Sequence, residues 1–128
     1  MHTYRLSAAA TVLGVSDDTL RRWVDAGRLP SLVDDAGRRV VAGIDLAAFA
    51  ATVAGDPAGP GDTSARNRFE GIVTRVLRGD VMSQVEVQSG PHRLVSLIST
   101  EAVDALALEP GAPAVASVKA TNVVVELP

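Results

Sequence analysis

The chain is divided by the stretch Ala54-Gly55-Asp56-Pro57-Ala58-Gly59-Pro60-Gly61-Asp62, which holds three glycines and two prolines in nine residues. Glycine frees the backbone and proline blocks both helices and sheet ladders, so this composition is typical of a linker. Apolar residues recur at helical spacing before the stretch and alternate as in strands after it. We therefore expect an α+β chain of two small domains, residues 1–53 and 63–128, joined by residues 54–62.

The composition indicates a globular protein of the cytoplasm. Of the 128 residues, 47% are hydrophobic, and no apolar run reaches the roughly 20 residues that span a bilayer. We expect no signal peptide and, without cysteine, no disulfide or thiolate metal site. His2 and His92 lack the spacing of metal ligands. No nucleophile–base pair or phosphate-cradling glycine loop is visible, so we expect no enzyme.

Two short helices joined by a turn are expected near the N-terminus. Residues 6–13 are rich in alanine and favour a helix, with Ser7 as its N-cap, and Gly14 then breaks it. Ser16 is expected to cap a second helix over residues 17–26. This order of helix, glycine turn and helix is typical of a helix-turn-helix motif.

A β-hairpin and a third helix follow. Two short segments, residues 29–33 and 38–41, flank a turn that ends in Gly37, as in a hairpin. Asp45 is expected to cap a helix over residues 46–53, whose apolar side chains cover the core. The N-terminal domain is therefore expected to be mostly α.

One string runs through these elements: Leu6-Ser7-x5-Leu13-Gly14-Val15-Ser16-x2-Thr19-Leu20-Arg21-Arg22-Trp23-x3-Gly27-Arg28-Leu29-Pro30. It resembles the winged helix-turn-helix of the MerR and excisionase group. The resemblance implies that residues 16–24 enter the major groove of DNA and that the Arg38-Arg39 hairpin contacts the backbone or the minor groove. The expected DNA-binding residues are Ser16, Thr19, Arg21, Arg22, Arg38 and Arg39.

The charge balance limits this expectation. The net charge is −3, and residues 1–62 carry six Arg against eight Asp, whereas affinity for DNA comes largely from neutralising phosphates. Alternatively, Arg21 and Arg22 are solvated helix charges that pair with Asp17, Asp18 or Asp25. A DNA-binding surface must then be a local patch of modest affinity per subunit, which oligomerisation raises.

The C-terminal half alternates as short strands. Strands are expected over residues 72–77, 81–87, 94–99, 114–118 and 122–126. Thr100 is expected to cap one short helix, residues 101–106. Several short strands with one small helix indicate a small β-barrel of the OB type.

Short motifs stand at both ends of this half. Ser64-Ala65-Arg66-Asn67-x-Phe69-x-Gly71-x-Val73 opens it, Gly79-x-Val81-x3-Val85 follows, and Val118-Lys119-Ala120-Thr121 closes it. Together they resemble the molbindin domain, also called Mop or TOBE. The resemblance implies paired domains, at least a dimer and up to a hexamer, that bind molybdate or tungstate at subunit interfaces. The oxyanion ligands implied by position are Ser64, Ala65, Arg66, Asn67, Lys119, Ala120 and Thr121.

The chemistry of these residues suits a tetrahedral dianion. Such an ion needs convergent hydroxyl and N–H donors, one or two fixed positive charges and few carboxylates. Ser64 and Thr121 supply hydroxyls, and Lys119, the only lysine, supplies charge. Donors without acceptors favour ionised molybdate over protonated phosphate, whereas tungstate should bind equally. Taken singly, each residue is equally consistent with an ordinary surface position.

The two halves together predict a transcriptional regulator whose affinity for double-stranded DNA depends on bound molybdate or tungstate. A second hypothesis is molybdate storage or buffering, with the N-terminal domain aiding assembly. A third is an architectural DNA-binding protein in which the barrel is an accessory.

Overall fold

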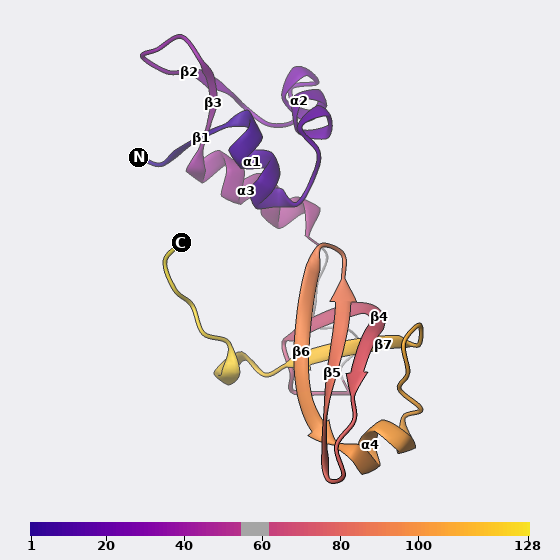
Figure 1. Cartoon of the computed structure of the whole chain (residues 1–128). Helices are drawn as coiled ribbons and strands as arrows, with labels where there is room; N and C mark the ends of the chain where they lie inside the picture. The colour runs from indigo at the N-terminus through magenta and orange to yellow at the C-terminus, as the bar shows by residue number, and fades with distance from the viewer. Residues whose placement is uncertain (55–61) are drawn as a thin grey trace. The chain divides into compact units, whose positions relative to one another are not determined.

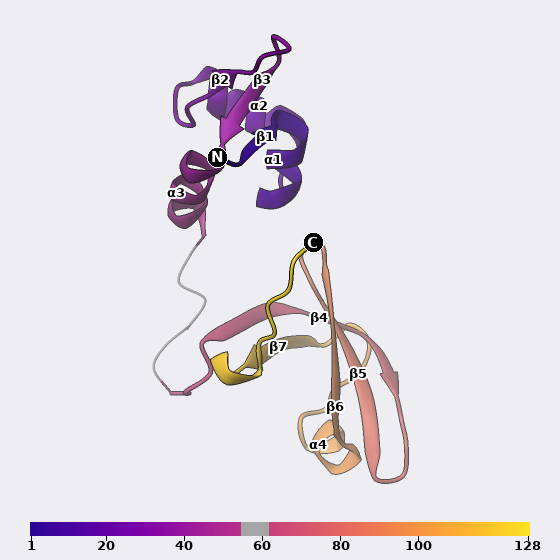
Figure 2. The ribbon, with the colours of Figure 1, turned by 90° about the vertical axis from the view of Figure 1, so that its left-hand side faces the viewer.

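A computed structural model describes residues 1–54 and 62–128, so most of the expected linker, residues 54–62, lies outside the described residues. The chain divides into two compact units, Met1–Gly55 and Asp56–Pro128, which are described separately (Figures 1 and 2). Among the described residues, no helix is both long and apolar enough to cross a membrane.

The N-terminal unit is a helix-turn-helix with a third helix behind it (Figure 1). Helix α1 spans Leu6–Leu13 and helix α2 spans Asp17–Asp25. Between them Gly14 has a φ of 68°, a left-handed conformation that favours glycine. Helix α3 spans Gly43–Val53. The shared core consists of Leu6, Ala9, Ala10, Leu20, Val24, Leu29, Val41, Leu46 and Phe49.

The sequence predicts the helix starts only in part. Ser16 caps α2 as predicted, because its hydroxyl accepts a hydrogen bond from the Thr19 N–H at 3.1 Å. The prediction for Ser7 is wrong, since a strand runs directly into α1 and places Arg5 at the N-cap. Asp45 does not cap α3 either; it lies in the first turn, where the helix dipole favours an acid.

A small antiparallel sheet, in the order β1-β3-β2, completes this unit. Its strands are β1 (Thr3–Arg5), β2 (Leu32–Val33) and β3 (Arg39–Ala42). Strands β2 and β3 with their turn, residues 32–42, are called the wing below. The wing starts three residues later than predicted, because the Leu29 N–H bonds back to the Trp23 carbonyl at 3.3 Å.

The C-terminal unit is a curled antiparallel sheet with one helix (Figures 1 and 2). The order of its strands is β6-β5-β4-β7, which makes the predicted small barrel a half-barrel. The elements are β4 (Asn67–Leu77), β5 (Met82–Ser89), β6 (His92–Ser99), α4 (Thr100–Ala105), β7 (Pro113–Val118) and a 3-10 turn (Ala120–Asn122). The core inside the curl contains Val73, Val85, Val87 and Val103.

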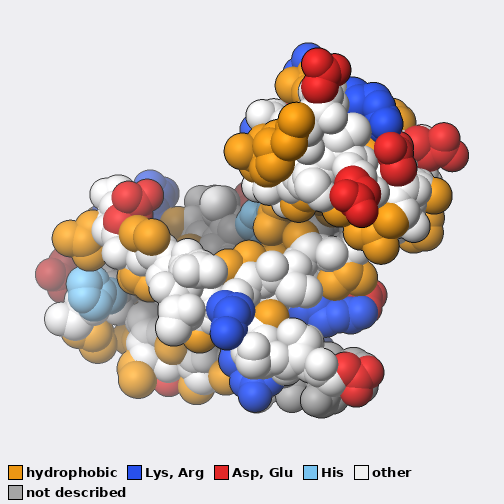
Figure 3. Space-filling view, turned by 90° about the horizontal axis from the view of Figure 1, so that it is seen from below, with side chains coloured by type: hydrophobic (Ala, Val, Ile, Leu, Met, Phe, Trp, Pro, Cys, Tyr) orange, Lys and Arg blue, Asp and Glu red, His pale blue; other side chains and the backbone are white. Residues whose placement is uncertain are grey.

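The last predicted strand, residues 122–126, is not formed. Residues 123–128, called the tail below, follow the 3-10 turn without regular structure. Strand β4 is longer than predicted, because its first half pairs with β7 from Asn67 onward. Apolar side chains remain exposed among charged ones over the face seen in Figure 3, and the most exposed include Val124 and Leu127 of the tail.

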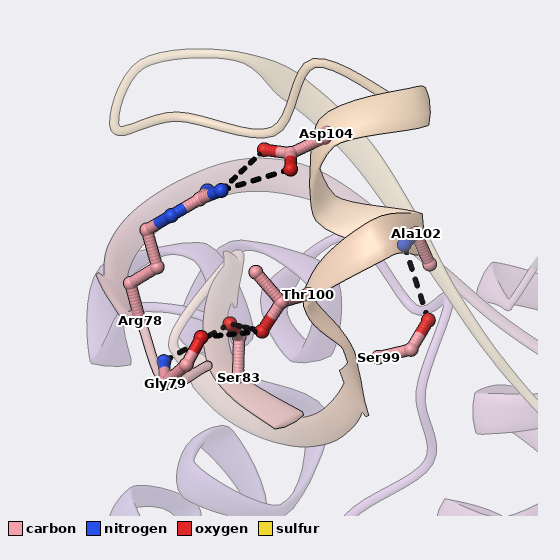
Figure 4. A network of polar contacts seen from close by, with 7 residues as sticks. All are labelled: Arg78, Gly79, Ser83, Ser99, Thr100, Ala102 and Asp104. Atoms are coloured by element: carbon pink, nitrogen blue, oxygen red, sulfur yellow. Dashed lines mark hydrogen bonds and ion pairs between the residues drawn. The ribbon is translucent and has the colours of Figure 1, made fainter. Parts of the chain in front are cut away.

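Helix α4 is anchored by buried hydroxyl groups (Figure 4). Ser99, and not Thr100 as predicted, caps α4, because its hydroxyl accepts from the Ala102 N–H at 3.1 Å. Thr100 donates instead to the Gly79 carbonyl at 2.7 Å, and its oxygen lies 2.7 Å from the Ser83 hydroxyl. Since the Thr100 proton is used on Gly79, Ser83 donates to Thr100. The buried hydroxyls therefore tie α4 to the turn before β5.

Candidate functional site

The pairing of β4 with β7 brings the two end motifs of the C-terminal unit together. Asn67, the first residue of β4, pairs with Val118, the last residue of β7. The Asn67 side-chain amide also donates to the Val118 carbonyl at 3.1 Å, although the two residues are 51 positions apart. Residues 64–67 and 119–121, called the donor segments below, therefore flank one end of the sheet.

Local hydrogen bonds shape the first donor segment. The backbone N–H of the buried Ala65 donates to the Thr63 hydroxyl at 3.1 Å. The Arg66 guanidinium donates to the Thr63 carbonyl at 3.3 Å. The Ala65 N–H is therefore engaged within the chain, whereas the side chain of Ser64 is exposed. Thr63 is a positioning residue that the sequence reasoning missed; a second hydroxyl residue next to Ser64 was the available signal.

The second donor segment is an exposed turn. Lys119 is the N-cap of the 3-10 turn, and its carbonyl accepts from the Asn122 N–H at 2.9 Å. Within the described residues, neither Lys119 nor Arg66 forms an ion pair with a carboxylate. Ala120 and Thr121 are exposed beside them. Hydroxyl donors and unpaired positive charges at one sheet end fit the chemistry of an oxyanion.

Four arginines meet at one place in the N-terminal unit. An open cavity of about 270 Å³, called the arginine cavity below, is lined by Arg5, Leu6, Ser7, Arg21, Arg38 and Arg39. These residues come from the end of β1, the start of α1, α2 and the wing. Four of the six arginines of residues 1–62 line the cavity, and its lining contains no acid. The acidic unit thus has a local cluster of arginines.

Acidic side chains orient the two wing arginines. Asp34 Oδ1 accepts hydrogen bonds from the N–H groups of Ala36 and Arg38, both at 2.9 Å, and Oδ2 lies 3.2 Å from Arg38 Nε. The backbone hydrogen bond from Arg38 is the main reason that the pKa of Asp34 lies below its ordinary value. Arg39 Nη2 lies 3.1 Å from Asp25 Oδ1. Exposed pairs of this kind add little stability, but they fix where the guanidinium groups lie.

The alternative pairing of Arg21 and Arg22 is not found in the described part of the chain. Neither forms an ion pair there, and Asp25 pairs with Arg39 instead. Arg21 lines the arginine cavity, whereas Arg22 does not. The structure therefore groups Arg21 with the wing arginines and separates it from Arg22.

Two other residues predicted to contact DNA, Ser16 and Thr19, hydrogen-bond to each other within the chain. The hydroxyls of Ser16 and Thr19 lie 2.9 Å apart, and Ser16 also caps the helix.

Sequence reasoning missed Arg5 and Ser7 in the cavity lining. Arg5 pairs with Val40 between β1 and β3, and a strand of three residues is too short to give a periodic signal.

Fold and site define a class of protein in which a helix-turn-helix unit precedes a small β unit that gathers anion donors at one sheet end. Comparison with known families agrees. Residues 3–53 match the helix-turn-helix domain family, and residues 63–125 match the TOBE domain family. The chain belongs to the TOBE domain family and carries a helix-turn-helix domain in front of the TOBE domain.

Two relatives illustrate the match of the C-terminal half. The chain is 37% identical over 70 residues to the molybdenum-pterin-binding protein MopA of Rhodobacter capsulatus, covering 54% of this chain and 26% of that protein. It is 35% identical over 63 residues to molybdenum-pterin-binding protein 2 of Clostridium pasteurianum, covering 48% and 93%. The chain thus spans about a quarter of the first relative and nearly all of the second.

A solved structure shares the fold of the C-terminal half. It is the cytoplasmic molybdate-binding protein ModG in a form with molybdate bound. The TM-score is 0.51 at 36% identity, and the match covers 57% of this chain and 52% of that one.

Proposed function

We propose that this protein is a cytoplasmic transcriptional regulator, active as a homo-oligomer, whose binding of double-stranded DNA depends on bound molybdate or tungstate. One observation carries the proposal: a single short chain contains both a cavity lined by four arginines and a sheet end flanked by two donor segments. The names of the relatives, which refer to molybdate and molybdenum-pterin, support the oxyanion part.

The proposed oxyanion ligands divide by role. Lys119 and Arg66 supply positive charge that no described carboxylate offsets. Ser64 and Thr121 supply hydroxyl donors, and the backbone at Ala120 supplies an N–H. We assign Asn67 a positioning role, because its amide donates to the chain that leads into the second donor segment. A set of donors without acceptors favours a fully ionised dianion.

The proposed DNA contacts also divide. One cavity is surrounded by Arg21, Arg38 and Arg39, and such a cluster can bind a phosphate of the DNA backbone. A phosphate contact positions the protein on the duplex but does not distinguish one base sequence from another. Arg22 lies on α2 outside this cavity and is therefore the candidate for a base contact in the major groove. Arg5 joins the phosphate-binding set.

Coupling follows if the oxyanion lies between subunits. A ligand held by donor segments of two chains fixes how their β units pair, and that pairing sets the spacing of the two α2 helices along DNA. The same molybdate that tightens the assembly then changes DNA affinity.

Calorimetry with molybdate tests the oxyanion site. Lys119→Ala should weaken binding by about 10- to 100-fold, because a charge-assisted hydrogen bond is lost. Arg78→Gln is the matched control: it also removes one positive charge from this unit, but Arg78 follows the far end of β4 and pairs with Asp104 of α4 (Figure 4). Equal affinity of the Lys119 variant and the unaltered protein would place the site elsewhere. Absence of molybdate binding by the unaltered protein would refute the oxyanion proposal.

A binding titration with duplex DNA, with and without saturating molybdate at constant salt, tests the coupling. The proposal requires a shift in affinity in either direction, and the shift should disappear in Lys119→Ala. An unchanged affinity contradicts the coupling even if both ligands bind.

The net charge of −3 favours a second candidate function, the storage or buffering of molybdate. In that case the N-terminal unit aids assembly, and the protein should pass through a heparin column at low salt. Retention on heparin that Arg21→Gln reduces would favour the regulator.

A further inference from the structure

The four arginines of the arginine cavity differ in what already binds them. Within the described residues, Arg5 and Arg21 form no ion pair. The two wing arginines, Arg38 and Arg39, are each paired with an aspartate, and neither aspartate belongs to the lining of the cavity. Half of the arginines that line the cavity are therefore engaged by carboxylates of the chain itself.

The two aspartates differ in their other contacts. Asp34 also accepts hydrogen bonds from the backbone N–H groups of Ala36 and Arg38, so it belongs to the turn of the wing. The Asp25 carboxylate accepts one hydrogen bond in the described part of the chain, from Arg39 Nη2 at 3.1 Å. This bond is also the one side-chain hydrogen bond there that joins α2 to the wing. Holding Arg39 is thus the single polar contact of Asp25.

The place of Asp25 on α2 does not favour the helix. Asp25 is the last residue of α2, where the helix dipole disfavours an acid. Its side chain is 66% exposed, so it adds nothing to the core. An exposed ion pair also contributes little to the free energy of unfolding. The position of this carboxylate is therefore better explained by what it does to Arg39 than by the stability of the unit.

Arg39 has two acceptors that compete for the same donors. Guanidinium groups bind carboxylates and phosphates through the same N–H groups. Arg39 donates to Asp25 through Nη2, and the same side chain lines the cavity proposed to bind a phosphate of DNA. A phosphate that reaches Arg39 meets a donor already in use and a carboxylate of like charge beside it. At Arg21, by contrast, a phosphate meets no such competition.

We propose that Asp25 is an internal competitor of DNA: its carboxylate holds the Arg39 guanidinium, and a backbone phosphate binds there only by displacing it. The inference rests on the proposed function, because it limits the DNA affinity that the arginine cavity supplies. Arg5 and Arg21 bind a phosphate directly, whereas the charge of Arg39 is offset by that of Asp25. Each subunit is thereby kept weak on DNA of arbitrary sequence, and tight binding depends on two subunits that bind together.

Asp25→Asn tests the competition, because it removes the charge and keeps the size of the side chain. The affinity for a labelled duplex of random sequence, measured by fluorescence anisotropy at about 0.1 M salt, should rise about 2- to 8-fold. The lower figure corresponds to the loss of an exposed ion pair and the upper one to a full additional phosphate contact. The slope of log K against log salt should steepen by up to about 0.9.

Combining this variant with Arg39→Gln separates competition from plain charge repulsion. If Asp25 acts through Arg39, the gain from Asp25→Asn should be at least about 2-fold smaller in the Arg39→Gln chain. Asp35→Asn is the matched control: it removes the same charge from an exposed wing residue that forms no ion pair in the described part, so its gain should be equal in both backgrounds. An equal gain from Asp25→Asn in both backgrounds, an unchanged affinity, or weaker binding by this variant overturns the inference.

The same chains distinguish this failure from a failure of the proposed function. If the unaltered protein binds the duplex and Arg21→Gln weakens that binding, DNA binding stands, and an absent gain in Asp25→Asn overturns the competition alone. If neither the unaltered protein nor Asp25→Asn binds duplex DNA, the proposed function and this inference both fail. All chains are compared at one molybdate concentration. Urea unfolding should show the Asp25 variant to be as stable as the unaltered protein, which excludes a change of fold as the cause of the gain.

Discussion

Replacing Arg21 with Gln should weaken binding of double-stranded DNA to the same extent for every sequence. Arg21 lines the arginine cavity, and it has no ion pair within the described residues, so its charge is available for a phosphate. Each phosphate neutralised contributes about 0.9 to the slope of log K against log salt. Losing one contact should lower that slope by about 0.9 and lower affinity about 8-fold at about 0.1 M salt.

Fluorescence anisotropy with a labelled duplex of random sequence, titrated at several salt concentrations, measures both quantities. Arg28→Gln is the matched control: it removes the same charge from the same unit, but its guanidinium lies 5.8 Å from the Trp23 ring centre and 5.7 Å from that of Phe49, outside the arginine cavity. Its slope should equal that of the unaltered protein. Equal slopes for the Arg21 variant and the unaltered protein, or equal losses in both variants, would refute the phosphate role of the cavity.

Three further predictions concern stability and the wing. Gly71→Ala should destabilise the C-terminal unit by about 3 kcal/mol or more, measured by urea unfolding, because an added Cβ would lie 2.0 Å from the Gln88 carbonyl oxygen of the paired strand. Ser99→Ala should cost about 1 kcal/mol through the lost cap of α4, and a cost near zero would show that the cap is dispensable. Because the backbone hydrogen bond from Arg38 holds the pKa of Asp34 below its ordinary value, this carboxylate stabilises the wing at higher pH. That stabilisation should be lost as the pH falls through the lowered pKa, seen as lower amide protection factors in the wing, and Asp34→Asn should remove the pH dependence.

The elements that the sequence predicts well are those whose signals are local. The Ser16 cap and the apolar spacing of Leu20 and Val24 define α2 without reference to the rest of the chain. The arginine cavity is different, because Arg5 reaches the wing only through the pairing of β1 with β3. Pairing between distant segments leaves little trace in a strand of three residues.

The candidate oxyanion site likewise has features that the sequence predicts and features that it does not. The residue types at 64–67 and 119–121 indicate anion chemistry from sequence alone. The role of Asn67 does not follow from its type, because its amide partner, the Val118 carbonyl, lies 51 positions away. Residues 122–126 were expected to be a strand, but a strand needs a partner strand, and within the described residues none pairs with this segment.

The place of β4 between β5 and β7 governs the order in which the C-terminal unit can fold. Strand β4 is made first, and the hairpins with β5 and β6 can form while the chain grows. Its other edge stays open until β7 has been made, because that edge pairs only with Pro113–Val118. Contacts over such long sequence separations form slowly, and an unpaired edge invites wrong partners in the meantime. A ribosome-bound chain stopped before Val118 would therefore hold the first donor segment without the Val118 carbonyl that accepts from Asn67.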